Sequence, residues 1–166
     1  MVEPTCRRPG RSRALIVCAA LSAPAQAADV WTQAHPAPPV PPAPFGGAIV
    51  DNDAHGLVLI TGATSLPFAE SAFRFDGADW TPLPASTSPV DLQKRTRFAA
   101  SGATGLPHSI IFGGVRGAEY FNDTIRFDGA TFTRLNTPIA PSPRADSAMA
   151  QNPDFGLILF GGRGPD

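Results

Sequence analysis

The chain has 166 residues, with 13 basic and 14 acidic side chains and a formal net charge of −1. This balance leaves no basic stripe of the kind that binds nucleic acid, so we expect no nucleic-acid partner. Its 16 glycines and 19 prolines are spread between short apolar runs, and no segment keeps a 3.6-residue apolar pattern for long. We therefore predict an all-β fold rich in turns.

The first 27 residues resemble a secretory signal peptide. Four arginines between residues 7 and 13 precede the apolar stretch Ala14–Leu21, and Ala25-Gln26-Ala27 has the small residues of a cleavage site. Roughly eight apolar residues cannot cross a hydrocarbon core that needs about 20, so we predict no membrane span. We expect export to the periplasm or the extracellular space, with cleavage between Ala27 and Ala28.

Cleavage at this point changes the composition of the mature chain. Both cysteines, Cys6 and Cys18, would be removed, so no disulfide could stabilise the remainder. Nine basic and 13 acidic side chains would remain, which gives a net charge of −4. The mature fold must therefore be stabilised by packing.

One passage occurs twice with the same internal spacing. The segments Ile60–Gly62 and Arg74–Thr81 are echoed by Phe112–Gly114 and Arg126–Thr133, each displaced by 52 positions. A partial third copy, Leu157–Gly162, follows 48 residues after the second. Self-similarity with a period near 50 residues is typical of repeat architectures.

Each repeat is predicted to contain four short strands. In the second repeat we place them at Phe98–Ser101, Ser109–Phe112, Thr124–Phe127 and Thr131–Leu135. The third and fourth strands form a predicted hairpin, because Asp128-Gly129 supplies the positive-φ residue that a tight turn needs. Asp76-Gly77 does the same in the first repeat.

The repeat resembles the kelch repeat of β-propellers. The two share four strands in each unit, a diglycine after the second strand and an aromatic residue at the start of the fourth. The segments Asn122–Leu135, Pro141–Ala150 and Gly156–Gly162 are similar to the version found in exported bacterial proteins. The resemblance implies an incomplete kelch-type propeller, with about two and a half four-stranded antiparallel blades plus a stray N-terminal strand.

The resemblance gives structural roles to twelve residues of the repeats. These are Gly62, Asp76, Gly77, Trp80, Gly113, Gly114, Asp128, Gly129, Phe132, Arg144, Gly161 and Gly162. The first repeat departs from the pattern, since Thr61 stands in place of the first glycine and Asp91–Arg95 stands where the second repeat has Ala140–Arg144. Phe132 occupies a position where the family usually has tryptophan.

The chain can be divided by these features. We predict a signal peptide at residues 1–27, an N-terminal strand and proline-rich link at 28–44, blade 1 at 45–90, blade 2 at 91–140 and a partial blade 3 at 141–166. Val30–Ala34 reads like the fourth strand of a blade, although a disordered proline-rich tail is the alternative. A closed propeller takes about four to eight blades, so we expect a truncated or fragmentary propeller whose partners include missing blades.

Few residues of the mature chain could support catalysis. Galactose oxidase, an enzyme of the superfamily that the resemblance implies, has a copper site that needs two tyrosines, two histidines and a cysteine bonded to one of the tyrosines, but here Tyr120 is the only tyrosine in the sequence. His35, His55 and His108 lack metal-ligand spacing and are expected on the surface. Asp51-Asn52-Asp53 lacks the later glycine and glutamate of a calcium loop, so we interpret it as a polar turn. We predict no catalytic residue, metal or cofactor.

A binding or scaffold role is the leading functional hypothesis. Function is usually carried by loops, here Ala63–Ser71 and Val115–Asn122. Arg116, Glu119 and Tyr120 mix charge with aromatic surface and could contact an unknown protein or carbohydrate ligand. Alternatively, Tyr120 and the neighbouring phenylalanine pack under the loop. A different hypothesis is a fragment of a kelch-fold enzyme, of the sugar mutarotase or oxidase type, whose active site lies in missing blades.

Overall fold

The computed structural model describes residues 36–37, 41, 46–62, 72–83, 92, 95–102 and 107–165. The chain divides into two compact units, Met1–Ala34 and His35–Asp166, and every described residue belongs to the second. The predicted signal peptide, the predicted strand Val30–Ala34 and the loop Ala63–Ser71 lie outside the described residues.

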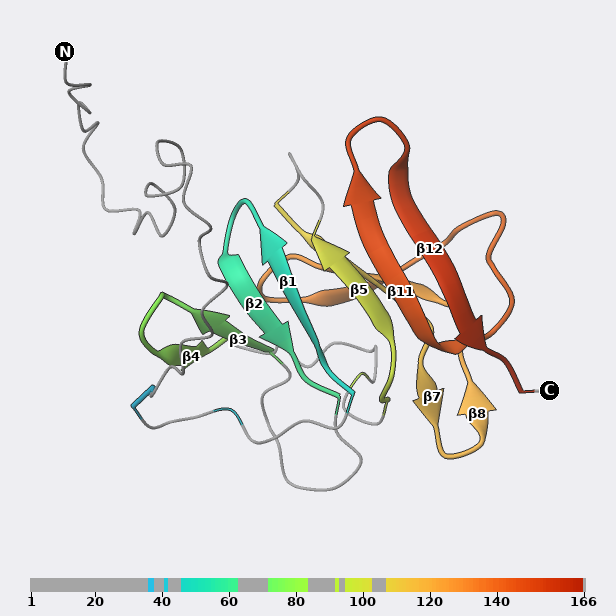
Figure 1. Ribbon diagram of the computed structural model, residues 1–166, viewed down its shortest axis with the longest axis horizontal. Helices are drawn as coiled ribbons and strands as arrows, with labels where there is room; N and C mark the ends of the chain where they lie inside the picture. Colours follow the sequence, from blue (N-terminus) through green and yellow to red (C-terminus); the bar gives the residue numbers. More distant parts are fainter. Residues whose placement is uncertain are drawn as a thin grey trace, which may run out of the picture. The chain divides into compact units, whose positions relative to one another are not determined.

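The described residues form antiparallel β-sheets and no α-helix, which confirms the predicted all-β class (Figure 1). Sheet 1 has the strand order β1-β2-β3-β4, sheet 2 has the order β5-β6-β9-β10, and sheet 3 is the pair β11-β12. A separate short hairpin pairs β7 with β8. None of the described sheets closes on itself, and no helix in the described ranges is long and apolar enough to cross a membrane.

The strands are short in sheets 1 and 2 and longer in sheet 3. Their bounds are β1 Ala48–Asn52, β2 Gly56–Ile60, β3 Ala72–Phe75, β4 Trp80–Pro82, β5 Ala99–Gly102, β6 Ser109–Phe112, β7 Val115–Arg116, β8 Glu119–Tyr120, β9 Thr124–Phe127, β10 Phe132–Leu135, β11 Ala145–Asn152 and β12 Gly156–Arg163. Strands β6 and β9 occupy the predicted ranges, while β5 and β10 each begin one residue later than predicted. Phe98 lies outside the β5 ladder and packs into the core instead, where it is 5% exposed.

Sheets 1 and 2 have equivalent Asp-Gly turns between their third and fourth strands. In sheet 2, the Asp128 carboxylate accepts the N–H groups of Ala130 and Thr131 at 3.1 and 2.8 Å, and Gly129 has a φ of 95°. Asp76 accepts two N–H groups in the same way in sheet 1, where Gly77 has a φ of 104°. The aspartate satisfies backbone donors that the hairpin leaves unpaired, and glycine adopts the positive φ without strain.

These hydrogen bonds favour the ionised carboxylates. The N–H groups of Asp79 and Ala78 lower the pKa of Asp76 below its ordinary value of 3.8. Partial burial acts to raise the pKa of Asp128, but the N–H groups of Thr131 and Ala130 outweigh that effect and lower it. Both turns are therefore more stable with an ionised aspartate.

We predict that the free energy of unfolding is constant near neutral pH and decreases as the pH falls below about 4. A carboxyl group with a lowered folded-state pKa stabilises the fold above its unfolded-state pKa, and this stabilisation is lost as the pH falls through the folded-state pKa. Urea unfolding between pH 7 and pH 3 measures the effect. The double variant Asp76→Asn and Asp128→Asn keeps oxygen acceptors that do not titrate, so its decrease should be smaller; an equal decrease would contradict this origin.

An aromatic pair links the third and fourth strands of each four-stranded sheet. Trp80 lies across from Phe75 with ring centroids 4.9 Å apart, and Phe132 lies across from Phe127 at 4.3 Å. The two sheets therefore repeat the same cross-strand contact although one uses tryptophan and the other phenylalanine.

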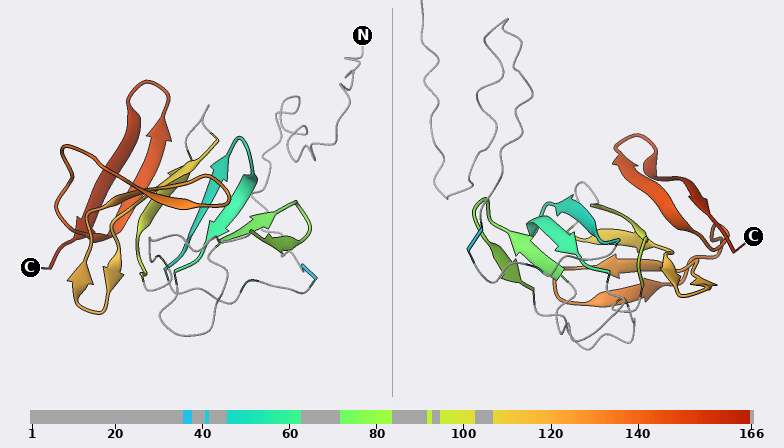
Figure 2. Two further views of the ribbon diagram at one scale, coloured as in Figure 1. Left: turned by 180° about the vertical axis from the view of Figure 1, so that it is seen from behind. Right: turned by 60° about the horizontal axis from the view of Figure 1, so that its bottom comes forward.

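The first strands of the three sheets lie side by side. Strand β5 packs against β1 on one side and β11 on the other, and all three run in the same direction (Figures 1 and 2). Equivalent backbone hydrogen bonds join successive sheets. Just before β5, the Arg97 N–H donates to the Gly46 carbonyl at 3.0 Å. Within β11, the Asp146 N–H donates to the Arg97 carbonyl at 2.9 Å. All three residues have φ between 58° and 66°. The sheets are therefore joined by equivalent main-chain contacts.

The main core lies between sheets 1 and 2. Its buried members are Val50, Val58, Ile60, Ala72, Leu92, Phe98, Ile111, Ile125, Phe127 and Phe132. Burying side chains of this size typically stabilises a fold by about 1.5–3 kcal/mol each.

A second contact between sheets 1 and 2 involves the turn after β1. Asp51 and Asn52 belong to β1, so the polar turn predicted at residues 51–53 is instead centred on residues 53–55. The His55 ring reaches sheet 2, where Nε2 lies 2.7 Å from the Asp128 carbonyl oxygen. That oxygen can only accept, so Nε2 donates. His55 was expected on the surface, and the hydrogen bond of its ring to a backbone carbonyl of sheet 2 was not predicted.

Candidate functional site

The predicted ligand loop Val115–Asn122 forms the short hairpin β7-β8, which projects at the bottom of Figure 1. Its base is fixed, because Val115 is 7% exposed and exchanges two backbone hydrogen bonds of 2.9 Å with Thr96. Its turn contains Gly117, which has a φ of 60° and open space around its Cα. The hairpin thus presents side chains from an anchored base.

The three predicted ligand residues lie together on this hairpin. Arg116 donates to Glu119 through Nε and Nη2, at 3.2 and 2.7 Å, and both side chains are largely exposed. Tyr120 is half-buried and pairs with Val115 across the hairpin. The ion pair fixes the direction of the Arg116 guanidinium, but exposed pairs of this kind contribute little to stability.

The Phe121 ring contacts two guanidinium groups. The Arg95 guanidinium carbon lies 3.8 Å from the centroid of the Phe121 ring, and that of Arg116 lies 5.3 Å from it. Phe121 is half-buried. Its ring connects the exposed Arg116 to the buried Arg95 through cation–π contacts.

Arg95 and Asp123 form a buried ion pair that sequence reasoning missed. Arg95 Nη1 and Nη2 contact the two carboxylate oxygens of Asp123 at 2.5 and 2.9 Å, and the two side chains are only 3% and 12% exposed. Asp123 also contacts Arg134 at 3.0 Å. The buried Nε of Arg95 has no hydrogen-bond partner among the described residues. The sequence did contain one indication that Arg95 has a structural role, because Arg95 occupies the same position in its repeat as Arg144.

Arg144, one of the predicted structural residues, joins sheet 3 to the loop before it. Its guanidinium donates to the Gly161 carbonyl at 2.9 Å and to both the carbonyl and the hydroxyl oxygen of Ser142. Its backbone carbonyl accepts the Gly114 N–H at 2.9 Å. Arg144 therefore fixes the loop geometry around the diglycine.

The two glycines of the diglycine lie very close to other backbone atoms. A Cβ on Gly113 would stand 2.5 Å from the Arg144 carbonyl oxygen, and one on Gly114 would stand 2.9 Å from the Thr96 carbonyl oxygen. Both glycines have positive φ, 67° and 95°. In the first repeat, Thr61 and Gly62 are also buried.

A third group of charges lies at the junction of β5 and sheet 3. The Asp146 carboxylate contacts Arg163 at 2.9 Å and Arg97 at 3.8 Å. These side chains are about half exposed, so the contacts leave part of each guanidinium accessible to solvent. One carboxylate is shared by two arginines here, as it is at Asp123.

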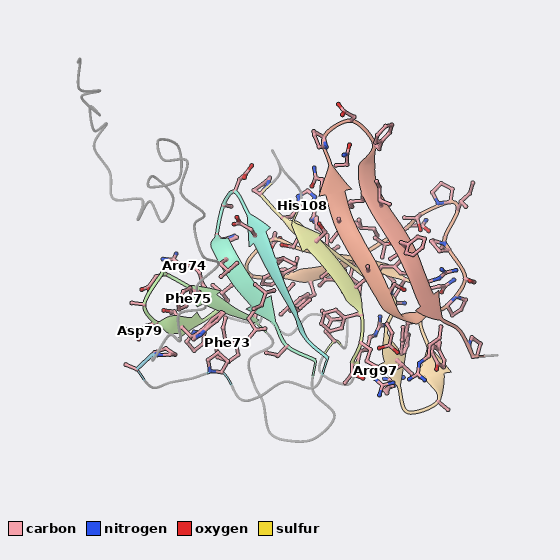
Figure 3. The ribbon with its side chains drawn as sticks, in the orientation of Figure 1. Phe73, Arg74, Phe75, Asp79, Arg97 and His108 are labelled. Atoms are coloured by element: carbon pink, nitrogen blue, oxygen red, sulfur yellow. The ribbon has the colours of Figure 1, made fainter. Side chains whose placement is uncertain are left out.

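Six of the eight arginines in the described ranges gather at one end of the strands. This arginine face consists of Arg95, Arg97, Arg116, Arg134, Arg144 and Arg163, and its described acidic side chains are Glu119, Asp123 and Asp146. The hairpin turns at the opposite end, residues 53–55, 76–79, 128–131 and 153–155, contain aspartates and no lysine or arginine, although Arg74 and Arg126 lie two residues before the second and third of them. Figure 3 shows Arg97 and His108 at these two opposite ends of sheet 2. The described unit is therefore electrostatically polar, with its positive end at the β7-β8 hairpin.

No metal centre is formed within the described ranges. They contain no group of three histidine, cysteine, aspartate or glutamate side chains that could hold an ion. His55 and His108 lie at the opposite end from the arginine face, and His35 lies outside the described residues. The arrangement that remains is one of fixed guanidinium groups, which bind carboxylate, sulfate or phosphate oxygens well.

No model of a protein family matches the chain, and no curated protein matches it. The geometry of the chain itself is therefore the basis for the functional conclusion.

Proposed function

We propose that the chain forms kelch-type propeller blades and serves as a non-catalytic binding module of an exported protein. The observation that carries this proposal is the equivalence of successive sheets. Their first strands lie side by side and are linked by the same backbone hydrogen bond, from Arg97 to Gly46 and from Asp146 to Arg97. Radial packing of four-stranded sheets with inner first strands is the arrangement of a propeller.

The arginine face is the proposed recognition surface. Six guanidinium groups face three carboxylates there, and Asp123 and Asp146 are each shared between two arginines. The excess positive charge and the Arg116–Phe121–Arg95 stack suit an anionic ligand, which a guanidinium group binds through paired hydrogen bonds. A carbohydrate with carboxylate groups has this chemistry and agrees with an exported protein.

We predict that the double variant Arg116→Ala and Tyr120→Ala binds polygalacturonate at least tenfold more weakly than the parent chain. Losing one charge-assisted hydrogen bond costs about 1.5–3 kcal/mol, and about 1.4 kcal/mol corresponds to tenfold in affinity. Isothermal titration calorimetry at low salt measures the dissociation constant.

The matched control is Asp154→Ala, which removes an exposed charge at the opposite end of the strands. It should bind as tightly as the parent chain. Neutral galactan should not bind to either protein. Unchanged binding by the Arg116 and Tyr120 variant, with its circular dichroism spectrum preserved, would reject the β7-β8 hairpin as part of the ligand surface.

A further inference from the structure

Sheet 3 exposes apolar side chains whose equivalents are buried in sheets 1 and 2. Ile158 and Phe160 on β12 are 46% and 79% exposed. Their equivalents in sheet 2, Ile110 and Phe112, are 6% and 3% exposed, because that face of sheet 2 is covered. In sheet 1 the equivalent residues, Val58 and Ile60, are completely buried. We call this side of each sheet its front face.

The core between sheets 1 and 2 shows what a front face packs against. The front face of sheet 1 contributes Val50, Val58 and Ile60 from its first two strands and Ala72 from its third. Sheet 2 contributes the opposite side, its back face, through residues on its second, third and fourth strands. These are Ile111, Ile125, Phe127 and Phe132. The buried side chains of a front face therefore come mainly from the two inner strands, whereas those of a back face come from the outer strands as well.

Sheet 1 has a back face of its own with exposed apolar side chains. Leu57 is 37% exposed and Ile49 is 58% exposed. The equivalent of Leu57 in sheet 2, Ser109, is completely buried. The Phe75–Trp80 pair lies on the same side, in the positions that Phe127 and Phe132 fill in the core. The described unit thus ends in an uncovered front face and an uncovered back face.

We propose that a second copy of the chain covers both faces. The front face of sheet 3 packs on the back face of sheet 1 of the partner, and the front face of the partner packs in the same way on the first chain. Sheet 3 has the two inner strands that supply most of a front face, and sheet 1 has all four strands that a back face uses. The contact continues the interface between sheets 1 and 2. The described residues of two copies supply six such sheets, a number within the range of closed propellers.

This inference rests on the proposed propeller arrangement, and sedimentation velocity of the full chain tests it. We expect a species with twice the mass of the chain. Two variants place a charge in the contact, Phe160→Glu on the front face and Leu57→Glu on the back face, and each should be a monomer. The control Ile139→Glu changes a side chain that is 89% exposed outside both faces, so this variant should remain a dimer.

Mixing the two variants distinguishes a head-to-tail dimer from other modes. An equimolar mixture of Phe160→Glu and Leu57→Glu retains one intact interface, so it should form dimers at concentrations where each variant alone does not. A Leu57→Glu variant that stays dimeric would overturn the head-to-tail contact in favour of a front-to-front one. An open series of larger oligomers would overturn ring closure.

The parent chain also provides a test that separates the two proposals. A parent chain that is monomeric, with a preserved near-ultraviolet circular dichroism spectrum, would overturn the proposed dimer. If it also bound polygalacturonate, the proposed binding function would stand without the dimer. Loss of anion binding in a chain that is still a dimer would reject the binding function alone.

Discussion

Replacing Gly113 by alanine is expected to lower the free energy of unfolding by about 3 kcal/mol or more. Gly113 has a φ of 67°, which costs an L-residue roughly 1–2 kcal/mol. Its new Cβ would also stand 2.5 Å from the Arg144 carbonyl oxygen and 3.0 Å from that of Phe121. Such overpacking adds typically about 1–3 kcal/mol. Urea unfolding followed by circular dichroism gives the difference.

The two carbonyl groups cannot easily move away from a Cβ on Gly113. The Arg144 carbonyl accepts the Gly114 N–H at 2.9 Å, and the Phe121 carbonyl accepts the Arg144 N–H at 3.0 Å. Displacing them would break the contact between sheet 2 and the start of sheet 3.

Gly161 provides a matched control, because it is the equivalent residue in sheet 3. It has a φ of 70°, but no atom lies within 4 Å of an added Cβ. Gly161→Ala should therefore cost only the backbone term, about 1–2 kcal/mol. Equal losses for Gly113→Ala and Gly161→Ala would show that close approach to the backbone contributes nothing.

Replacing Arg95 by methionine is expected to destabilise the fold by about 3–5 kcal/mol. The change keeps much of the side-chain volume but leaves the Asp123 carboxylate, which is 12% exposed, without its buried cation. It also removes the cation–π contact with Phe121. Guanidinium chloride unfolding with linear extrapolation measures the loss.

Two further variants show whether the unpaired charge causes this loss. Arg134 is the exposed partner of Asp123, and its side chain is 59% exposed. Arg134→Met should therefore lower the free energy of unfolding by less than about 1 kcal/mol. The double variant Arg95→Met and Asp123→Leu removes both buried charges, so it should be more stable than Arg95→Met alone. A double variant that is less stable than the single variant would contradict this explanation.

The strands and turns that depend on local sequence were predictable. Strands β6 and β9 were placed correctly because short β-prone runs end at Gly113-Gly114 and at Asp128-Gly129, whose turn requirements are local. The predicted start of β5 was wrong by one residue, because Phe98 is as β-prone as the residues that follow it. Only its packing into the core takes it out of the ladder.

The candidate site was predictable only in part. Arg116, Glu119 and Tyr120 are close in sequence, so a shared hairpin could be expected. Arg95 and Asp123 are 28 positions apart, and their contact depends on how sheet 2 lies on the loop before it. Nor does the sequence indicate the positive φ of Arg97, because arginine is uncommon in that conformation.

The repeated bond through Gly46, Arg97 and Asp146 has a consequence for sequence variation. It joins main-chain N–H and carbonyl groups, so three different side chains occupy equivalent places in the three sheets. The junction keeps its geometry with glycine, arginine and aspartate, although its positive φ disfavours most other side chains. Substitutions at Arg97 and Asp146 that tolerate this φ can therefore alter the charge beside the innermost strands while the main-chain bonds between the sheets are kept.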